Sequence, residues 1–101
     1  MAVKKVALPK IIQFDWDEGN LHKSRLKHYV EPTECEEVFF NDPLLTSPDP
    51  AHSSTESRFI SLGQTNRNRK LLVAFTIRKQ KIRIISARNQ SKKERTLYEK
   101  S

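Results

Sequence analysis

Apolar residues recur with a period of two through the second half of the chain. Residues 58–62 alternate and end at Gly63, and two further β-rich runs, 71–77 and 82–87, are joined by the polar segment 78–81. Alternation with this period is the pattern of a half-buried strand, and a short polar link between two such runs is typical of a hairpin. We therefore expect consecutive antiparallel strands in this half.

The first half of the chain has shorter patterns, which predict one strand and one helix. Residues 11–16 have the pattern of a short strand, and Asp17 is placed to cap a helix that runs to about His28. Its first turn contains Gly19 and Asn20, which weaken it because both are poor helix formers. The apolar face of this helix is thin, and the residues expected on it are Trp16, Leu21 and Leu26.

Two further helices are marked by capping boxes, in which a Ser or Thr precedes a Glu by three residues. Thr33 with Glu36 forms the first box and Ser91 with Glu94 the second. The helix that follows Thr33 is expected to end at residues 41–43. The residues expected to face inward are Cys35, Val38 and Phe39 in that helix and Leu97 and Tyr98 in the last one.

The order of these elements predicts an α+β fold. Residues 46–55 are rich in Pro, Ser, Asp and Thr and predict an exposed loop. Residues 1–10 are short, basic and without period, so we expect a loose arm followed by a single domain over residues 11–101. The predicted architecture is a mainly antiparallel sheet of about four to five strands, with two N-terminal helices and one C-terminal helix.

Charge narrows the class of partner. The 101 residues include 19 Lys and Arg against 12 Asp and Glu, a net charge of +7. This excess favours an anionic partner: nucleic acid first, an acidic protein second and a membrane surface third. The longest apolar run, 71–77, is far shorter than the ~20 residues that span a bilayer, and the N-terminus lacks the apolar core of a signal peptide. The cytoplasm is therefore the expected compartment.

Several classes of site are disfavoured by what the sequence lacks. Cys35 is the only cysteine, which excludes a disulfide within the chain. The three histidines have no metal-ligand spacing, so neither a metal nor a cofactor is expected. No phosphate-binding loop, dinucleotide fingerprint or nucleophile elbow is present.

Lys27 and His28 are adjacent where the first helix should end. Cations near a helix C-terminus are favoured by about 0.3–1 kcal/mol through the macrodipole, which is sufficient to explain them. Alternatively, the pair transfers protons or binds phosphate, because His titrates near neutrality and Lys carries a compact charge.

Three arginines and a glutamate lie in the predicted strands or next to their ends. Glu56 and Arg58 lie two residues apart and share a face, either as a surface ion pair or with the carboxylate orienting Arg58 towards an anionic substrate. Strict alternation places Arg83 and Arg88 on opposite faces. Arg83 is expected on an exposed face or at a polar site, and its fork suits phosphate. The remaining basic residues fit a nucleic-acid backbone or solubility alone: Arg67, Arg69, Lys79, Lys81, Lys92, Lys93 and Arg95.

Taken together, these motifs resemble the BrnT toxin family over about residues 14–99. The resemblance is carried by Phe14-Asp15-Trp16-Asp17, Lys27-His28, Val38-Phe39, Asp42-Pro43, Glu56-x-Arg58 and Gly63. Its most specific part is Arg83-Ile84-Ile85-Ser86-Ala87-Arg88, followed by Glu94-Arg95 and Tyr98.

The resemblance implies a type II toxin with a RelE-like ribonuclease fold that cleaves RNA without a metal. It also implies a BrnA-type antitoxin, encoded by an adjacent gene, that holds the toxin inactive, and a toxin–antitoxin hetero-oligomer is the assembly that would follow. Carried over by motif position, the candidate catalytic residues are Lys27, His28, Glu56, Arg58, Arg83 and Arg88. An alternative remains open, in which a catalytically weakened toxin fold acts as an RNA- or partner-binding module.

Overall fold

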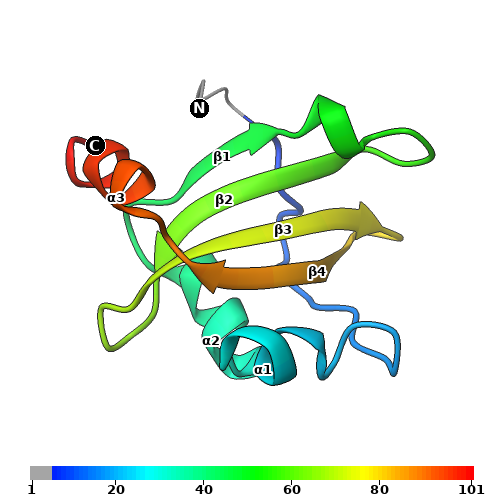
Figure 1. Ribbon diagram of the computed structural model, residues 1–101. Helices are drawn as coiled ribbons and strands as arrows, with labels where there is room; N and C mark the ends of the chain where they lie inside the picture. The colour runs from blue at the N-terminus through cyan, green and yellow to red at the C-terminus, as the bar shows by residue number, and fades with distance from the viewer. Residues whose placement is uncertain (1–5) are drawn as a thin grey trace.

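Four antiparallel strands pair in chain order and form the sheet around which the chain is arranged (Figure 1). The structure is a computed structural model and describes residues 6–101. The strands are β1 (Leu45–Pro48), β2 (Arg58–Gln64), β3 (Lys70–Arg78) and β4 (Lys81–Asn89). The α-helices are α1 (Lys23–His28), α2 (Pro32–Glu37) and α3 (Lys92–Glu99), and the 3-10 helices are η1 (Val38–Phe40) and η2 (Pro50–His52). The predicted α+β architecture is confirmed, with two N-terminal helices and one C-terminal helix.

One face of the sheet is buried under the N-terminal half of the chain. Figure 1 shows the segment before α1 crossing behind the strands. Phe39 of η1 packs edge-to-face on Phe75 of β3 and on Phe14, with ring centroids 5.1 Å and 5.7 Å apart. Cys35 and Val38 are buried in the same cluster, so the predicted inward face of this region is confirmed. Burial of each such large side chain contributes about 1.5–3 kcal/mol, and this core holds the sheet rigid.

The opposite face, which we call the open face, carries α3 at one end. Ser91 and Glu94 cap this helix as predicted: the Glu94 N–H donates to Ser91 Oγ at 3.2 Å and the Ser91 N–H donates to Glu94 Oε1 at 2.8 Å. The buried Tyr98 donates its hydroxyl proton to the Pro43 carbonyl at 2.6 Å and fixes α3 against the chain that enters β1.

Residues 11–16 contact the sheet through a single bridge instead of a full strand. Phe14 forms an isolated parallel bridge with Ile82 at the start of β4. The Ile82 N–H donates to the Gln13 carbonyl, and the Asp15 N–H donates to the Ile82 carbonyl. Residues 6–10 have no regular secondary structure, and the first five residues of the predicted loose arm lie outside the described residues.

The first helix begins at Lys23, later than the sequence predicted. Asp17 does not cap it, because its carboxylate accepts the Gly19 N–H at 2.8 Å and Asn20 Oδ1 accepts the Asp17 N–H at 2.8 Å. These bonds close a turn, which is the structure that short polar side chains favour over helix. Leu26, expected on the apolar face, is 76% exposed.

Two further expectations are corrected by the structure. The capping box of α2 uses Glu34, whose carboxylate accepts the Glu31 N–H at 3.0 Å, so the helix begins at Pro32 and the Thr33 prediction is wrong. Part of the predicted loop 46–55 is strand β1, which pairs along β2 from Leu45↔Leu62 to Pro48↔Phe59. The Pro- and Ser-rich composition indicated a loop. This segment is nevertheless an edge strand, where Pro is tolerated, and its backbone groups are hydrogen-bonded to β2.

Candidate active site on the open face

A β-bulge decides which charged side chains share the open face. In the β3–β4 ladder Phe75 pairs with Ile84 but Ala74 pairs with Ser86, so Ile85 has no partner. The extra residue shifts the alternation by one position. Arg83 and Arg88 therefore lie on the same face, and the expectation of opposite faces is wrong.

Three cross-strand rows define the open face, since residues paired across neighbouring strands point the same way. The rows run Arg58–Thr76–Arg83, then Ile60–Ala74–Ser86, then Leu62–Leu72–Arg88. Two row spacings along a strand amount to about 14 Å. The face thus has a cation pair at one end, small and apolar residues in the middle and a third arginine at the other end.

At the Arg88 end a cleft of about 210 Å³ opens where α1 meets the sheet. Lys27 and His28 of α1 line it together with Ser86 and Arg88 of β4. The structure therefore brings three of the six predicted site residues into one cleft, with Lys23 as a further cation. We call this the α1–β4 cleft.

Two buried polar side chains fix α1 along the outer edge of β4. Ser24 Oγ accepts the Ala87 N–H at 2.7 Å, and Asn20 Nδ2 donates to the Ile84 carbonyl at 2.9 Å. An edge strand has unpaired backbone groups that must be satisfied when they are buried, and these side chains satisfy two of them. Sequence reasoning missed both anchors, because a short polar residue in a weak helix carries no signal of what it bonds.

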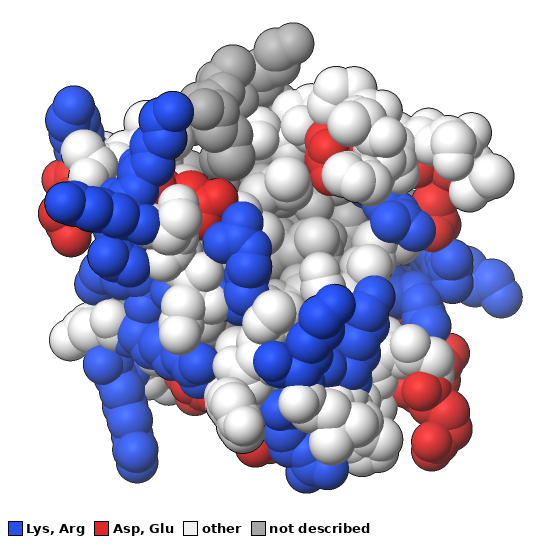
Figure 2. All heavy atoms as spheres, viewed as in Figure 1, with Lys and Arg blue, Asp and Glu red and all other residues white. Residues whose placement is uncertain are grey.

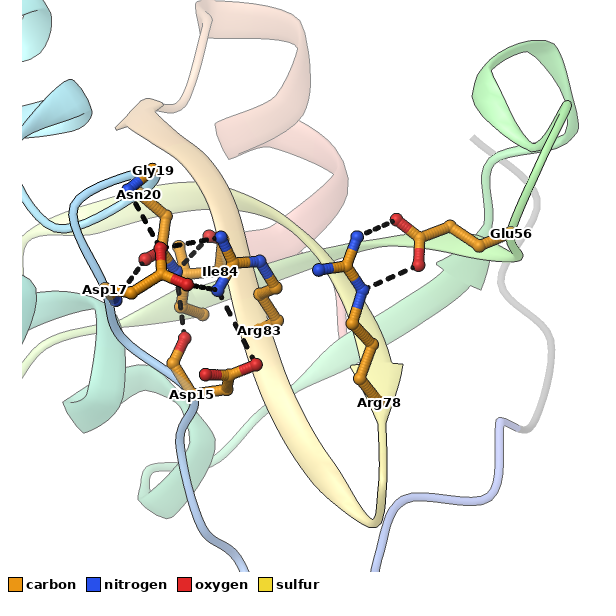
Figure 3. Close-up of polar contacts among 8 residues, drawn as sticks. All are labelled: Asp15, Asp17, Gly19, Asn20, Glu56, Arg78, Arg83 and Ile84. Carbon is orange, nitrogen blue, oxygen red and sulfur yellow. Dashed lines mark hydrogen bonds and ion pairs between the residues drawn. The ribbon is translucent and has the colours of Figure 1, made fainter.

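Arg83 lies at the other end of the open face and forms a bidentate ion pair with Asp17 (Figure 3). Its Nη1 and Nη2 donate to the two Asp17 oxygens at 3.0 Å and 2.9 Å, and Asp15 lies 3.5 Å from Nη1. The side chain of Arg83 is only 14% exposed. This hydrogen bonding lowers the pKa of the Asp17 carboxyl and raises the pKa of Arg83. The guanidinium is held in one orientation.

Glu56 forms a second such pair, with Arg78 and not with Arg58. Arg78 Nε and Nη2 donate to its carboxylate at 2.9 Å and 2.8 Å, and Figure 3 shows Arg78 next to Arg83. The Arg78 bond is the main cause of the lowered pKa of Glu56, with a smaller contribution from the nearby charge of Arg58. Glu56 precedes β2, so the prediction that it orients Arg58 from the same strand is wrong. Arg58 itself makes no side-chain hydrogen bond with the described residues.

Arg88 is paired as well, although it lines the α1–β4 cleft. Its Nη1 and Nη2 donate to the Glu94 carboxylate at 2.8 Å and 3.0 Å, and this hydrogen bond raises the pKa of Arg88. Glu94 also caps α3, so it fixes Arg88 relative to that helix. A guanidinium has five N–H donors, and the bonds of Arg88 leave some of them for a phosphate in the cleft.

Positive charge dominates the open face as a whole. Figure 2 shows Lys and Arg atoms gathered over its lower half and over α3, with Asp and Glu atoms in smaller groups among and around them. Such a surface attracts a polyanion and speeds its association.

A cysteine nucleophile, a metal-binding cluster and a membrane-spanning helix were each sought in the part of the chain that the structure describes. Burial raises the pKa of the Cys35 thiol to about 12, so this residue is not a nucleophile at neutral pH. Within residues 6–101, no three His, Cys, Asp or Glu side chains are grouped as they would be to hold a metal ion. No helix there is both long and apolar enough to cross a membrane.

Comparison with protein families identifies relatives of this chain. A family described as "Ribonuclease toxin, BrnT, of type II toxin-antitoxin system" matches residues 16–94, which include both ends of the open face. No curated protein matches the chain.

Proposed function

This chain belongs to the BrnT family of ribonuclease toxins of type II toxin–antitoxin systems, and we propose that it is an endoribonuclease that needs no metal ion. The observation that carries the proposal is the α1–β4 cleft. There Lys27 and His28 face Arg88 at the edge of a cationic sheet surface.

Cleavage of RNA without a metal requires three kinds of group. A base must take the proton of the 2′-hydroxyl as its oxygen attacks the phosphorus. Cations must stabilise the charge that develops on the phosphorane, and an acid must protonate the departing 5′-oxygen. The products of this route are a 2′,3′-cyclic phosphate and a 5′-hydroxyl, since the 2′-oxygen replaces the 5′-oxygen on phosphorus.

We assign proton transfer to Lys27 and His28. Both side chains line the α1–β4 cleft, and neither makes a side-chain hydrogen bond with the described residues. Groups without a fixed carboxylate partner are free to exchange protons with a substrate.

We assign charge stabilisation to Arg58, Arg83 and Arg88. Arg58 and Arg83 flank Thr76 in one cross-strand row, so both can reach a phosphate that lies across the strands. Glu56 acts in this account through Arg78, by holding a neighbouring positive charge in place. An RNA strand laid along the open face would then pass from this arginine row to the α1–β4 cleft.

The second part of the proposal is a cognate antitoxin of the BrnA type, from an adjacent gene, that keeps the toxin inactive. Membership of a type II family implies an antitoxin partner. A net charge of +7 on so small a chain gives a strong steering field for an acidic protein that would cover the open face.

A second candidate function is a binding module that has lost catalysis. The observation in its favour is that Arg83 and Arg88 are both occupied by carboxylates, which compete with a phosphate for the same donors. Growth arrest on induced expression of the toxin alone separates the two, since a mere binding module would leave growth unaffected.

Purified protein freed of antitoxin tests metal independence. It should degrade RNA at equal rates in EDTA and in magnesium. Complete loss of cleavage in EDTA, restored by added metal, would contradict the proposal.

Co-expression with the neighbouring gene tests the antitoxin part of the proposal. It should give a complex that survives purification and no longer cleaves RNA. Recovery of a free and harmless toxin would contradict this part.

A further inference from the structure

Arg69 joins four segments that meet near the end of α1. It lies in the turn between β2 and β3, and its Nε donates to Asn89 Oδ1 of β4 at 2.8 Å. Its Nη1 donates to the backbone carbonyl of Tyr29 at 2.9 Å and to the Glu34 carboxylate of α2 at 3.0 Å. Its Nη2 donates to the backbone carbonyl of His28 at 3.4 Å. The guanidinium thus connects both N-terminal helices to the sheet.

The two carbonyls that Arg69 contacts belong to the helix end that carries the proposed proton-transfer groups. The last carbonyls of a helix have no partner within it, and a cation there is favoured by the macrodipole. Helix α1 has six residues, too few to be stable without tertiary contacts. Tyr29, the residue that follows its last turn, has a φ of 56°, a left-handed conformation that is unfavourable for a residue with a side chain. This end of the helix therefore depends on contacts from outside.

We propose that Arg69 is a positioning residue of the ribonuclease, which holds the C-terminal end of α1 so that Lys27 and His28 stay at the wall of the α1–β4 cleft. The inference rests on the proposed function, since it assigns Arg69 a role in the same site. Arg69 is not among the residues that line the cleft. Its charge is met by Glu34. It therefore acts through α1 and not on the RNA.

Lysine cannot replace Arg69 in this role. The bonds run from three different nitrogens of one planar group to acceptors on α1, α2 and β4 and at Tyr29, the residue that follows α1. A lysine has a single nitrogen at the end of a flexible stem and cannot span these acceptors together. Conservation of charge alone should therefore not preserve the activity.

The test compares Arg69→Gln and Arg69→Lys with Arg67→Gln, a change of an exposed arginine in the same turn. Single-turnover cleavage of a short RNA should fall about 10- to 100-fold in Arg69→Gln, as expected for a small misplacement of reacting groups. Affinity for the same RNA, made uncleavable by 2′-deoxy substitution, should stay within about twofold of wild type, since Arg69 does not touch it. Arg69→Lys should show most of the loss in rate, and Arg67→Gln should cleave at the wild-type rate.

Hydrogen exchange supplies a readout that does not depend on activity. The N–H groups of Tyr29 and Val30 bond to carbonyls of Arg25 and Ser24 within α1. In the Arg69 variants these two amides should exchange at least about tenfold faster, while amides of β3 remain protected. Arg69→Lys provides this comparison even if Arg69→Gln does not fold.

The outcomes separate the two proposals. Wild-type rates of cleavage in Arg69→Gln, or a weakened affinity with an unchanged rate, would overturn the positioning role while the ribonuclease proposal stands. Absence of cleavage by the wild-type protein would remove the ribonuclease proposal. In that case unchanged exchange at Tyr29 and Val30 would overturn the structural basis of the inference, and faster exchange would support it.

Discussion

The charged groups of the open face are held in two different ways. The guanidiniums of Arg78 and Arg83 at one end, and that of Arg88 in the α1–β4 cleft, are each bound by a carboxylate through two hydrogen bonds. Lys27 and His28 in the same cleft have no side-chain partner within the described part of the chain. The difference matches two chemical tasks. A cation that stabilises a developing charge must be oriented beforehand, whereas a group that transfers protons must be free to change its charge.

The largest effect should come from the cleft, through Lys27→Ala and His28→Ala. Each should lower single-turnover cleavage on the order of 10²- to 10⁴-fold, the usual contribution of an acid or base. Both side chains project from a surface helix, so the thermal midpoint should change little. Lys23→Ala is the matched control, because Lys23 lines the same cleft from the same helix. If Lys23→Ala is as damaging as the other two, the cleft contributes only charge.

The arginine row should give the next largest effect. Arg58→Ala and Arg83→Ala should each lower cleavage on the order of 10²-fold, or about 3 kcal/mol of activation free energy. Antitoxin binding should survive in both. Only Arg83→Ala leaves Asp15 and Asp17 without their cation, so only this variant should also lower the thermal midpoint. Equal midpoints for the two variants would show that the ion pair has no structural role.

The sequence predicted the architecture better than it predicted the site. Period-two patterning located β2, β3 and β4, and the Ser91 capping box located α3. It could not reveal the bulge at Ile85, because one extra residue leaves the apolar pattern almost unchanged while it moves Arg88 to the other face. The strand β1 was hidden by its Pro- and Ser-rich composition.

The partners in the ion pairs could not be predicted from the sequence, for a different reason. Arg83 and Asp17 are 66 residues apart, and Glu56 and Arg78 are 22 apart. The pairing of Arg83 with Asp17 depends on how the N-terminal segment crosses the sheet, which no local pattern records. The pairing of Glu56 with Arg78 depends on the register of β2 and β3, in which Arg58 lies opposite Thr76. The predicted set of residues nevertheless includes Lys27, His28 and Arg88, which meet in one cleft.

A smaller effect is expected from charges outside both regions. Lys92 and Lys93 are exposed in the first turn of α3. Lys92→Ala combined with Lys93→Ala should weaken RNA affinity by less than about tenfold and flatten its dependence on salt. The single-turnover rate at saturating RNA should stay at the wild-type value. If the pair is as damaging to that rate as Arg83→Ala, the site is a diffuse charge patch.

The smallest effect concerns the stability of the fold at acid pH, through the carboxylates that pair with Arg83 and Arg78. The pKa values of Asp17 and Glu56 are lowered in the folded protein, from ordinary values of 3.8 and 4.5. A carboxyl with a depressed pKa stabilises the fold above its ordinary value, and this contribution disappears as pH falls below about 4. Asp17 is exposed and Glu56 is partly exposed, so water screens both ion pairs and the contribution is small.

Asp17→Asn combined with Glu56→Gln should therefore flatten the fall of the thermal midpoint between pH 5 and about pH 3. Glu18→Gln, a change of an exposed carboxylate next to Asp17, should leave the wild-type slope. If the thermal midpoint of the double variant falls with pH as steeply as that of the wild type, these two carboxylates do not stabilise the fold.

The nature of the RNA ends tests the central claim most directly, namely that the α1–β4 cleft cleaves RNA through the 2′-hydroxyl without a metal. Two short substrates are incubated with wild-type protein in EDTA, one all RNA and one with a single 2′-deoxy residue at the scissile position. The account predicts a 2′,3′-cyclic phosphate and a 5′-hydroxyl from the first substrate, no cleavage of the second, and formation of the first products slowed on the order of 10²- to 10⁴-fold in His28→Ala. A 5′-phosphate product, or cleavage at the 2′-deoxy position, would contradict it.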